Sequence, residues 1–158
     1  MDREPASVTS ATRQSERQMT REEIVAFFDR RQEAWDNLDA AALAADYAPD
    51  CIIESPMAGT HIGPAAAQAA LQAAFAAFLD MKIRTDRLVI DGNRVAQLAH
   101  GDGTDLGGFM GMPATGKPFR LTAVFVYELD GHRIVREQRI YDFTGLLVQI
   151  GVLKAKPA

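Results

Sequence analysis

Apolar residues recur with a helical period in the N-terminal part of the chain. The sequence Thr20-Arg-Glu-Glu23 is typical of a capping box, in which threonine and glutamate side chains satisfy the first backbone N–H groups of a helix. After it, apolar side chains return every three or four positions and predict a helix that ends near Asn37: Ile24, Phe27, Phe28, Trp35 and Leu38. Asp39 can cap a short second helix over residues 40–47, which Pro49 stops.

A short strand over residues 51–55, a loop over 56–63 and an alanine-rich helix over 65–81 are expected next. Pro64 fits the first turn of this third helix, because its missing N–H would have no partner there. The small alanine side chains would let the helix lie close against a sheet.

The pattern then changes to strands, over residues 83–90, 95–101, 119–129 and 133–143. Asp-Gly pairs at 91–92 and 130–131 indicate hairpin turns, and residues 145–151 favour a short closing helix. Helices set apart from an antiparallel succession of strands predict an α+β domain over residues 20–158, after a flexible polar tail over 1–19. A strongly curved sheet over a long helix leaves an open mouth that suits a small-molecule pocket.

Alternation along the last two strands predicts which side chains point inward. The larger, more aromatic face of residues 119–129 is expected inside: Phe119, Leu121, Ala123, Phe125, Tyr127 and Leu129. On the last strand, one face carries Val135, Glu137, Arg139 and Tyr141. Because ionisable groups are costly to bury unless paired, Glu137 and Arg139 either face water or form a working pair in the pocket.

Composition limits the classes of function. The 158 residues carry a net charge of −4, which does not suggest a nucleic-acid partner. No apolar run reaches the length of a membrane span and the N-terminus has no apolar signal core, so we expect a soluble, cytoplasmic protein. The single cysteine, Cys51, excludes an internal disulfide and is expected to be a buried thiol.

The histidines do not indicate a metal site. His61, His100 and His132 are far apart, and no second histidine stands four residues from any of them, so no metal is expected. His100 could act as a base oriented by Asp102 or Asp105, or simply be a satisfied histidine at a strand end. Asp142 is either a catalytic carboxylate or the cap of the last helical turn.

Four stretches of the chain resemble the SnoaL-like polyketide cyclases, or ester cyclases, of the nuclear transport factor 2-like superfamily. The most specific stretches are GTDLGGFMGMPATGKPF and DGHRIVREQRIYDFTGLLVQIG, at the mouth hairpin and the last strand. The upstream stretches AWDNLDAAALAADYAPDCIIESP and GTHIGPAA resemble the family's opening elements. The resemblance covers about residues 21–151 and implies a cone-shaped barrel that forms a homodimer through its outer sheet face.

The resemblance also implies chemistry. The family's cyclases close rings by intramolecular aldol reactions without metal or organic cofactor, using an aspartate on or just after the last strand as acid/base. The carboxylates available here are Glu137 and Asp142, and one alignment puts Arg139 at the acid/base position. The chain departs from the family pattern at the helper positions, Ala123 and Phe125, and at Asp105, where the family has histidine.

The expected function is therefore that of a cofactor-independent acid/base enzyme on a small hydrophobic carbonyl compound. It would perform an aldol-type cyclisation or a related isomerisation or dehydration, with Asp142, Glu137, Arg139 and His100 as catalytic candidates. Substrate would bind among Trp35, Tyr47, Phe75, Phe78, Phe109, Met112, Phe125 and Tyr141. The alternatives are epoxide-hydrolase-like or other lyase or isomerase chemistry in the same pocket, or a non-catalytic ligand-binding or dimerisation domain.

Overall fold

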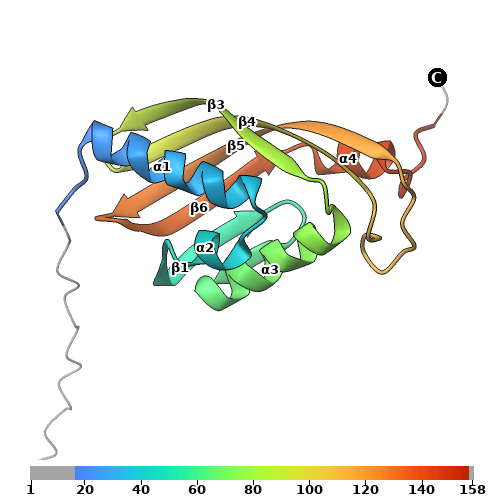
Figure 1. The fold of residues 1–158 in the computed structure, drawn as a ribbon, viewed down its shortest axis with the longest axis horizontal. Helices are drawn as coiled ribbons and strands as arrows, with labels where there is room; N and C mark the ends of the chain where they lie inside the picture. The colour runs from blue at the N-terminus through green and yellow to red at the C-terminus, as the bar shows by residue number, and fades with distance from the viewer. Residues whose placement is uncertain (1–16, 157–158) are drawn as a thin grey trace, which may run out of the picture.

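The computed structural model describes residues 17–156 and has mixed helices and strands, as predicted (Figure 1). The helices are α1 (Arg21–Asp36), α2 (Ala40–Ala44), α3 (Pro64–Ala77) and α4 (Phe143–Gln149). The strands are β1 (Tyr47–Ser55), β2 (Gly59–Ile62), β3 (Lys82–Asp91), β4 (Arg94–Thr104), β5 (Pro118–Asp130) and β6 (Arg133–Tyr141). This is the α+β class expected from the order of the elements.

The strands form one curved sheet in the order β2-β1-β6-β5-β4-β3. Strands β3 to β6 are antiparallel neighbours, which confirms the predicted succession. Strand β1 pairs in parallel with β6, so the N-terminal half of the chain closes the sheet beside its last strand. Strand β2 was expected to be loop, but it pairs with β1 from Ile52↔Ile62 to Ser55↔Gly59. Four residues are too few for an alternating pattern to reveal a strand.

Three helices cover the concave face of the sheet (Figure 1). Helix α1 packs against β3 and α2, while α3 packs against α2 and β1. The capping box at Thr20 is present, with Glu23 N–H donating to the threonine hydroxyl. Helix α3 ends at Ala77 rather than near Met81, because Phe78 leaves the helical conformation and turns the chain toward β3. The helices thus bury one sheet face and form the floor of the candidate site.

The core confirms most of the predicted inward faces. The odd-numbered side chains of β5 are buried or half-buried, and Tyr127 is fully buried. On β6, Ile134 is buried while Val135 is only half-buried, contrary to the simple alternation. A register shift between Glu128 and Leu129 explains this, because it changes the phase at the start of β6. Cys51 is a buried free thiol, as expected.

Most of the predicted tail lies outside the described residues, which begin at 17. Within them, Met19 is already buried in the core, so packing begins before the predicted boundary at residue 20. In the part of the chain from 17 to 156, no helix is both long and apolar enough to cross a membrane.

Candidate active site

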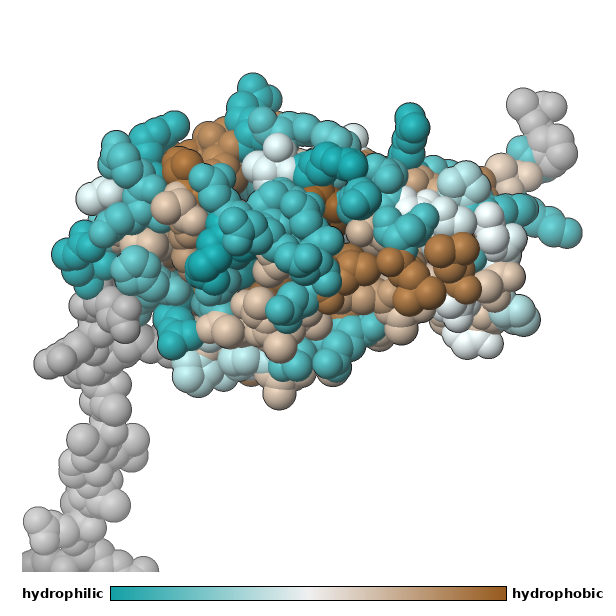
Figure 2. Space-filling view, in the orientation of Figure 1, coloured by the Kyte–Doolittle hydropathy of each residue, from teal (hydrophilic) through white to brown (hydrophobic). Residues whose placement is uncertain are grey.

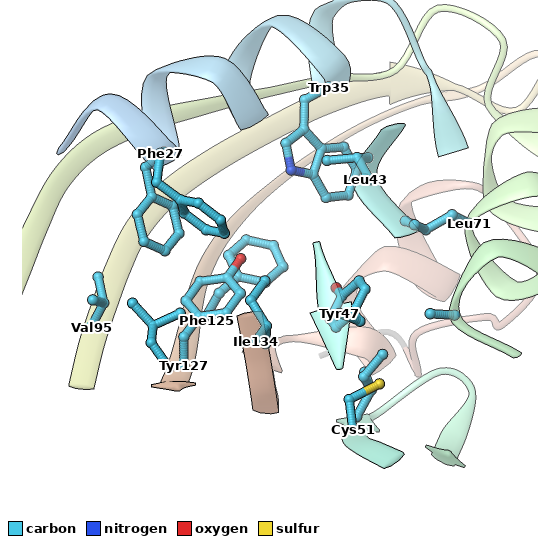
Figure 3. Packing of buried hydrophobic residues seen from close by; sticks show 14 of the residues in the cluster. Phe27, Trp35, Leu43, Tyr47, Cys51, Leu71, Val95, Phe125, Tyr127 and Ile134 are labelled. Atoms are coloured by element: carbon cyan, nitrogen blue, oxygen red, sulfur yellow. The ribbon is translucent and has the colours of Figure 1, made fainter. Parts of the chain in front are cut away.

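A cavity of about 70 Å³ lies between the helices and the concave face of the sheet. Side chains from α1, α3, α4 and the central strands line it. They are Trp35, Met57, Leu71, Ala74, Phe75, Phe78, Met81, Ile83, Phe119, Leu121, Phe125, Arg139, Tyr141 and Leu146. Figure 3 shows Trp35 pointing from α1 toward the sheet, on the same side as Phe125. Trp35 meets Phe75 edge to face at 5.7 Å between ring centroids, which fixes one wall.

A buried ion pair stands behind this wall. Arg139 Nε donates to Glu137 Oε1 at 2.6 Å, and the hydroxyl of Tyr47 donates to the other oxygen of Glu137. Glu137 is 1% exposed and Arg139 12% exposed. Of the two alternatives expected for Glu137 and Arg139, the structure therefore shows a buried pair and not two side chains that face water.

The electrostatics of this group keep Arg139 cationic. Burial, the largest single effect, works against the charge of Arg139, but the charge and hydrogen bond of Glu137 together with Tyr47 and Tyr127 raise the pKa of the guanidinium above its usual value. Burial, followed by the charge of Glu137, raises the pKa of Tyr47, so Tyr47 remains a neutral hydrogen-bond donor. The arrangement is a fixed carboxylate that holds a permanent cation against the cavity.

Arg139 has donors left over after its contact with Glu137. Arg139 lines the cavity and uses Nε for Glu137, and among the described residues no hydrogen bond engages its two terminal nitrogens. Tyr141, two residues further on the same strand face, also lines the cavity, and its hydroxyl lies 3.3 Å from the hydroxyl of Ser55 on β1. Polar groups thus enter an otherwise apolar cavity from β6, and Ser55 of β1 supports one of them.

A second buried arginine is paired with a different carboxylate. Arg31 Nη1 donates to Asp46 at 2.8 Å and to the Leu43 carbonyl at 3.1 Å. Its guanidinium lies over the rings of Phe27, Tyr47 and Tyr127 at 5.5–5.9 Å from their centroids. Arg31 does not line the cavity, and we assign it to the stability of the core.

Of the predicted substrate contacts, Trp35, Phe75, Phe78, Phe125 and Tyr141 lie in the cavity wall. The remaining three lie outside the wall. Tyr47 is buried behind the wall against Glu137, and Phe109 packs on Phe78 with ring centroids 5.3 Å apart. Met112 is 40% exposed on the surface.

Three of the four catalytic candidates do not line the cavity: Glu137 lies behind it, and Asp142 and His100 lie elsewhere. Asp142 is exposed and caps α4 by accepting a hydrogen bond from Gly145 N–H at 2.7 Å. Of its two predicted roles, the structure therefore shows the helix cap. The predicted orientation of His100 by Asp102 or Asp105 is wrong, because His100 Nδ1 lies 2.7 Å from Asp86. His100 is on the outer face of β4, where a residue at an even position points away from the core.

Asp105 instead anchors the glycine-rich segment 105–117. Its carboxylate accepts from the backbone of Gly108 and from both the backbone and the hydroxyl of Thr115. Gly107 lies so close to the end of α3 that a Cβ would stand 1.8 Å from the Ala76 carbonyl oxygen. Figure 2 shows a hydrophobic patch in this region, where Leu79, Leu106, Met110 and Met112 are exposed.

Several contributors were missed by the sequence analysis. Arg31 stands four residues after Phe27 and four before Trp35, so its place on the apolar helix face was visible and indicated burial. The sequence does not reveal Ser55 as a site residue, because its position beside Tyr141 depends on the parallel β1–β6 pairing. Among the described residues, no group of three histidine, cysteine, aspartate or glutamate side chains is arranged to hold a metal ion.

Comparison with known proteins adds a family and related folds. The profile of the family described as SnoaL-like polyketide cyclase matches residues 26–150. IdmH of Streptomyces antibioticus, a proposed polyketide cyclase, is 29% identical with a TM-score of 0.69, covering 80% of this chain and 97% of its own. AclR of Streptomyces galilaeus, a proposed hydroxylase, is 22% identical with a TM-score of 0.75, covering 87% of this chain and 91% of its own. No curated protein matches the sequence.

Proposed function

Because the chain belongs to the SnoaL-like polyketide cyclase family, we propose that it is a cofactor-independent enzyme that closes a ring in a small hydrophobic β-dicarbonyl compound. The observation that carries this proposal is the cation of Arg139, held by Glu137 and turned to an apolar cavity. A cation preorganised in a dry site stabilises negative charge that develops on oxygen far better than water does.

The reaction needs only the transfer of protons. A C–H between two carbonyls loses its proton to water, and Arg139 binds the oxygen of the resulting enolate. The enolate carbon attacks a third carbonyl, further along the same molecule, so that a C–C bond forms, the C=O π bond breaks and that carbonyl oxygen becomes an alkoxide. Tyr141 gives its proton to the alkoxide and regains one from water through Ser55, whose hydroxyl lies 3.3 Å away. Nothing is oxidised or reduced.

In this mechanism Arg139 and Tyr141 touch the substrate, while Glu137 is a positioning residue. Glu137 is 1% exposed and is not part of the cavity wall, and both its oxygens accept hydrogen bonds. The family's acid/base carboxylate is thus replaced here by an arginine that a carboxylate holds in place. We do not assign Asp142 the acid/base role, because it caps α4.

The experiment that tests this proposal is a screen of β-dicarbonyl and polyketide-like compounds with product identification by mass spectrometry and NMR. We expect an isomeric cyclic product from the wild type. Glu137→Gln/Arg139→Met should lower kcat about 10²–10³-fold, the cost of removing one oxyanion donor. Arg136→Met is the matched control, because Arg136 is on the exposed face of the same strand and pairs with Glu54. Equal kcat values in the two variants would refute the role of Arg139.

A second candidate function is binding without catalysis. It is favoured by the wall of the cavity, in which none of the described residues is a carboxylate that could remove a proton. Tight binding of a ligand that is recovered chemically unchanged, in the presence of an intact Arg139, would support this alternative.

We also propose a homodimer through the outer sheet face. Val89 and Ile140 are about half exposed there, and the half-buried Leu98, Val124 and Val126 extend the apolar surface between them. Sedimentation velocity should show a dimer that Ile140→Asp dissociates, while Leu153→Asp at the C-terminal end leaves it intact. A monomeric wild type would exclude this interface.

A further inference from the structure

Arg139 presents two donors to the cavity side by side. Its Nε is engaged by Glu137, so the planar guanidinium can turn only its terminal nitrogens toward a ligand. Two parallel N–H donors on a rigid plane match a pair of cis oxygens, as in bidentate arginine contacts with carboxylates. A ligand with one oxygen would pair with only one of these two N–H donors.

The charged groups behind the cavity form a connected cluster. Three guanidinium groups, those of Arg30, Arg31 and Arg139, are linked to only two carboxylates, those of Asp46 and Glu137. Arg31 also interacts electrostatically with Glu137, which connects the two ion pairs. Arg30 is half exposed, so solvent screens its charge, and the buried groups alone balance as the pairs Arg31–Asp46 and Arg139–Glu137. The case for an anion therefore rests on the donors of Arg139 that Glu137 does not use.

We propose that the ligand of this cavity is a small apolar molecule that ends in two cis oxygens sharing one negative charge, held end-on by Arg139. The class includes the enolate of a 1,3-dicarbonyl compound and a carboxylate, which offer the guanidinium the same pair of acceptors. This inference rests on the proposed function and narrows its substrate. It also states that the substrate is bound in its ionised form.

The size of the cavity guides the choice of probe. A cavity of about 150 Å³ accommodates benzene in another protein, whereas this one has about 70 Å³. An aromatic ring would therefore require movement of flexible wall side chains such as Met57 and Met81. Acetylacetone, an open-chain 1,3-dicarbonyl compound, is no smaller than a benzene ring and needs the same movement, but its chain is flexible and its enolate absorbs at longer wavelength than its neutral forms.

The test is a titration of acetylacetone with the wild type, followed by absorbance and calorimetry across pH. The ligand pKa should fall by about one unit or more on binding, because an opposite charge at close range favours the ionised form. Isobutyrate and pentan-2-one are the other probes, one a carboxylate and the other a neutral ketone. We expect pentan-2-one to bind at least about tenfold more weakly than the better of the two anions. Whichever anion binds more tightly identifies the source of the oxygen pair.

Variants separate recognition from folding. Glu137→Gln/Arg139→Met should lose the preference for anions without leaving a buried charge unpaired, and Arg139→Lys should keep part of it, because lysine has the charge but not the fork. Arg136→Met should bind like the wild type. Equal binding of pentan-2-one and both anions, or an unchanged anion preference in the double variant, would overturn the inference.

The binding data also separate the two proposals. Anion binding that depends on Arg139, with no cyclic product from any β-dicarbonyl compound, would leave the ligand class standing and remove the proposed reaction. Cyclisation without a preference for anions would leave the proposed reaction standing and remove the proposed ligand class.

Discussion

Arg31 and Arg139 are both buried among aromatic side chains and each is paired with a carboxylate, but they differ in what remains of the guanidinium. Arg31 is enclosed by three rings, Asp46 and a backbone carbonyl. Within residues 17–156, Arg139 donates to Glu137 alone, and it borders a cavity. Arg31 Nε is also without a hydrogen-bond partner among these residues, but it is sealed in the core, whereas Arg139 is in the cavity wall where a ligand can meet it.

The carboxylate partners differ in the same way. Asp46 accepts from Arg30 as well as Arg31, and it joins α1 to the segment before β1. Glu137 accepts from Tyr47 and Arg139, and its two partners fix the direction of the guanidinium rather than joining distant elements. Substitutions at the two arginine sites should therefore separate stability from activity.

The largest loss of stability is expected from Arg31→Leu. Removal of this charge leaves Asp46 buried with only the half-exposed Arg30, and we expect the free energy of unfolding to fall by about 4 kcal/mol in urea denaturation. Arg30→Leu is the control and should cost about 1 kcal/mol or less, as exposed ion pairs do. Equal losses in the two variants would break the distinction between an enclosed and an accessible arginine.

The next effect tests whether the Glu137–Arg139 pair exists for stability. Glu137→Leu leaves Arg139 charged and unpaired and should lower the free energy of unfolding by about 3 kcal/mol. The double variant Glu137→Leu/Arg139→Met should recover most of that loss, because a buried ion pair can often be replaced by apolar side chains of similar volume. It should nevertheless be inactive in the cyclisation assay. A double variant as unstable as the single one would make the pair structural, like Arg31.

The fold was predictable where patterns are long. The helical spacing through Trp35 and the alternation along β5 repeat over several turns or residue pairs, and the capping box at Thr20 is a specific four-residue motif, so all three could be predicted locally. Strand β2 and the phase at Ile134 escaped prediction, because a four-residue strand and a register shift leave no periodic signal.

The site was predictable only in part, for a physical reason. Period two put Glu137, Arg139 and Tyr141 on one face, and the structure brings that face to the core. The same period could not tell whether this face meets water or the core, and it says nothing of partners on other strands. Ser55 and Tyr47 reach β6 through the parallel β1–β6 pairing, which is a contact between residues more than 80 positions apart.

A smaller effect is expected at the loop beside the cavity. Asp105→Ala removes the acceptor of three hydrogen bonds from Gly108 and Thr115 and should cost about 1–3 kcal/mol of stability. Hydrogen exchange at the amides of Gly108 and Thr115 should accelerate, while amides in β5 are protected as before. Asp105→Asn, which keeps one acceptor oxygen, should lie between. Unchanged exchange in Asp105→Ala would mean that the segment is held by Phe109 and its aromatic neighbours instead.

The smallest effect is expected at an exposed pair with the same geometry as the buried one. Arg17 lies 2.6 Å from Glu23, the distance that also separates Arg139 from Glu137, but its side chain is 65% exposed. The hydrogen bond from Arg17, followed by the one from the backbone of Thr20, lowers the pKa of Glu23 to about 2. A carboxylate with a depressed folded-state pKa contributes stability above its unfolded pKa, near 4.3, and loses that contribution as pH falls toward 2.

Glu23→Gln should therefore lower Tm slightly at pH 7, and the difference from the wild type should shrink between about pH 4 and pH 2. The measurement is a series of thermal denaturations of both proteins across that range. Added salt should reduce the difference at pH 7, because exposed charges are screened, but it should leave the cost of Glu137→Leu nearly unchanged. A difference at residue 23 that is constant with pH would assign it to the helix cap rather than to the ion pair. The comparison between the ion pairs Arg17–Glu23 and Arg139–Glu137, which have equal N···O distances, would then depend only on the burial of Arg139.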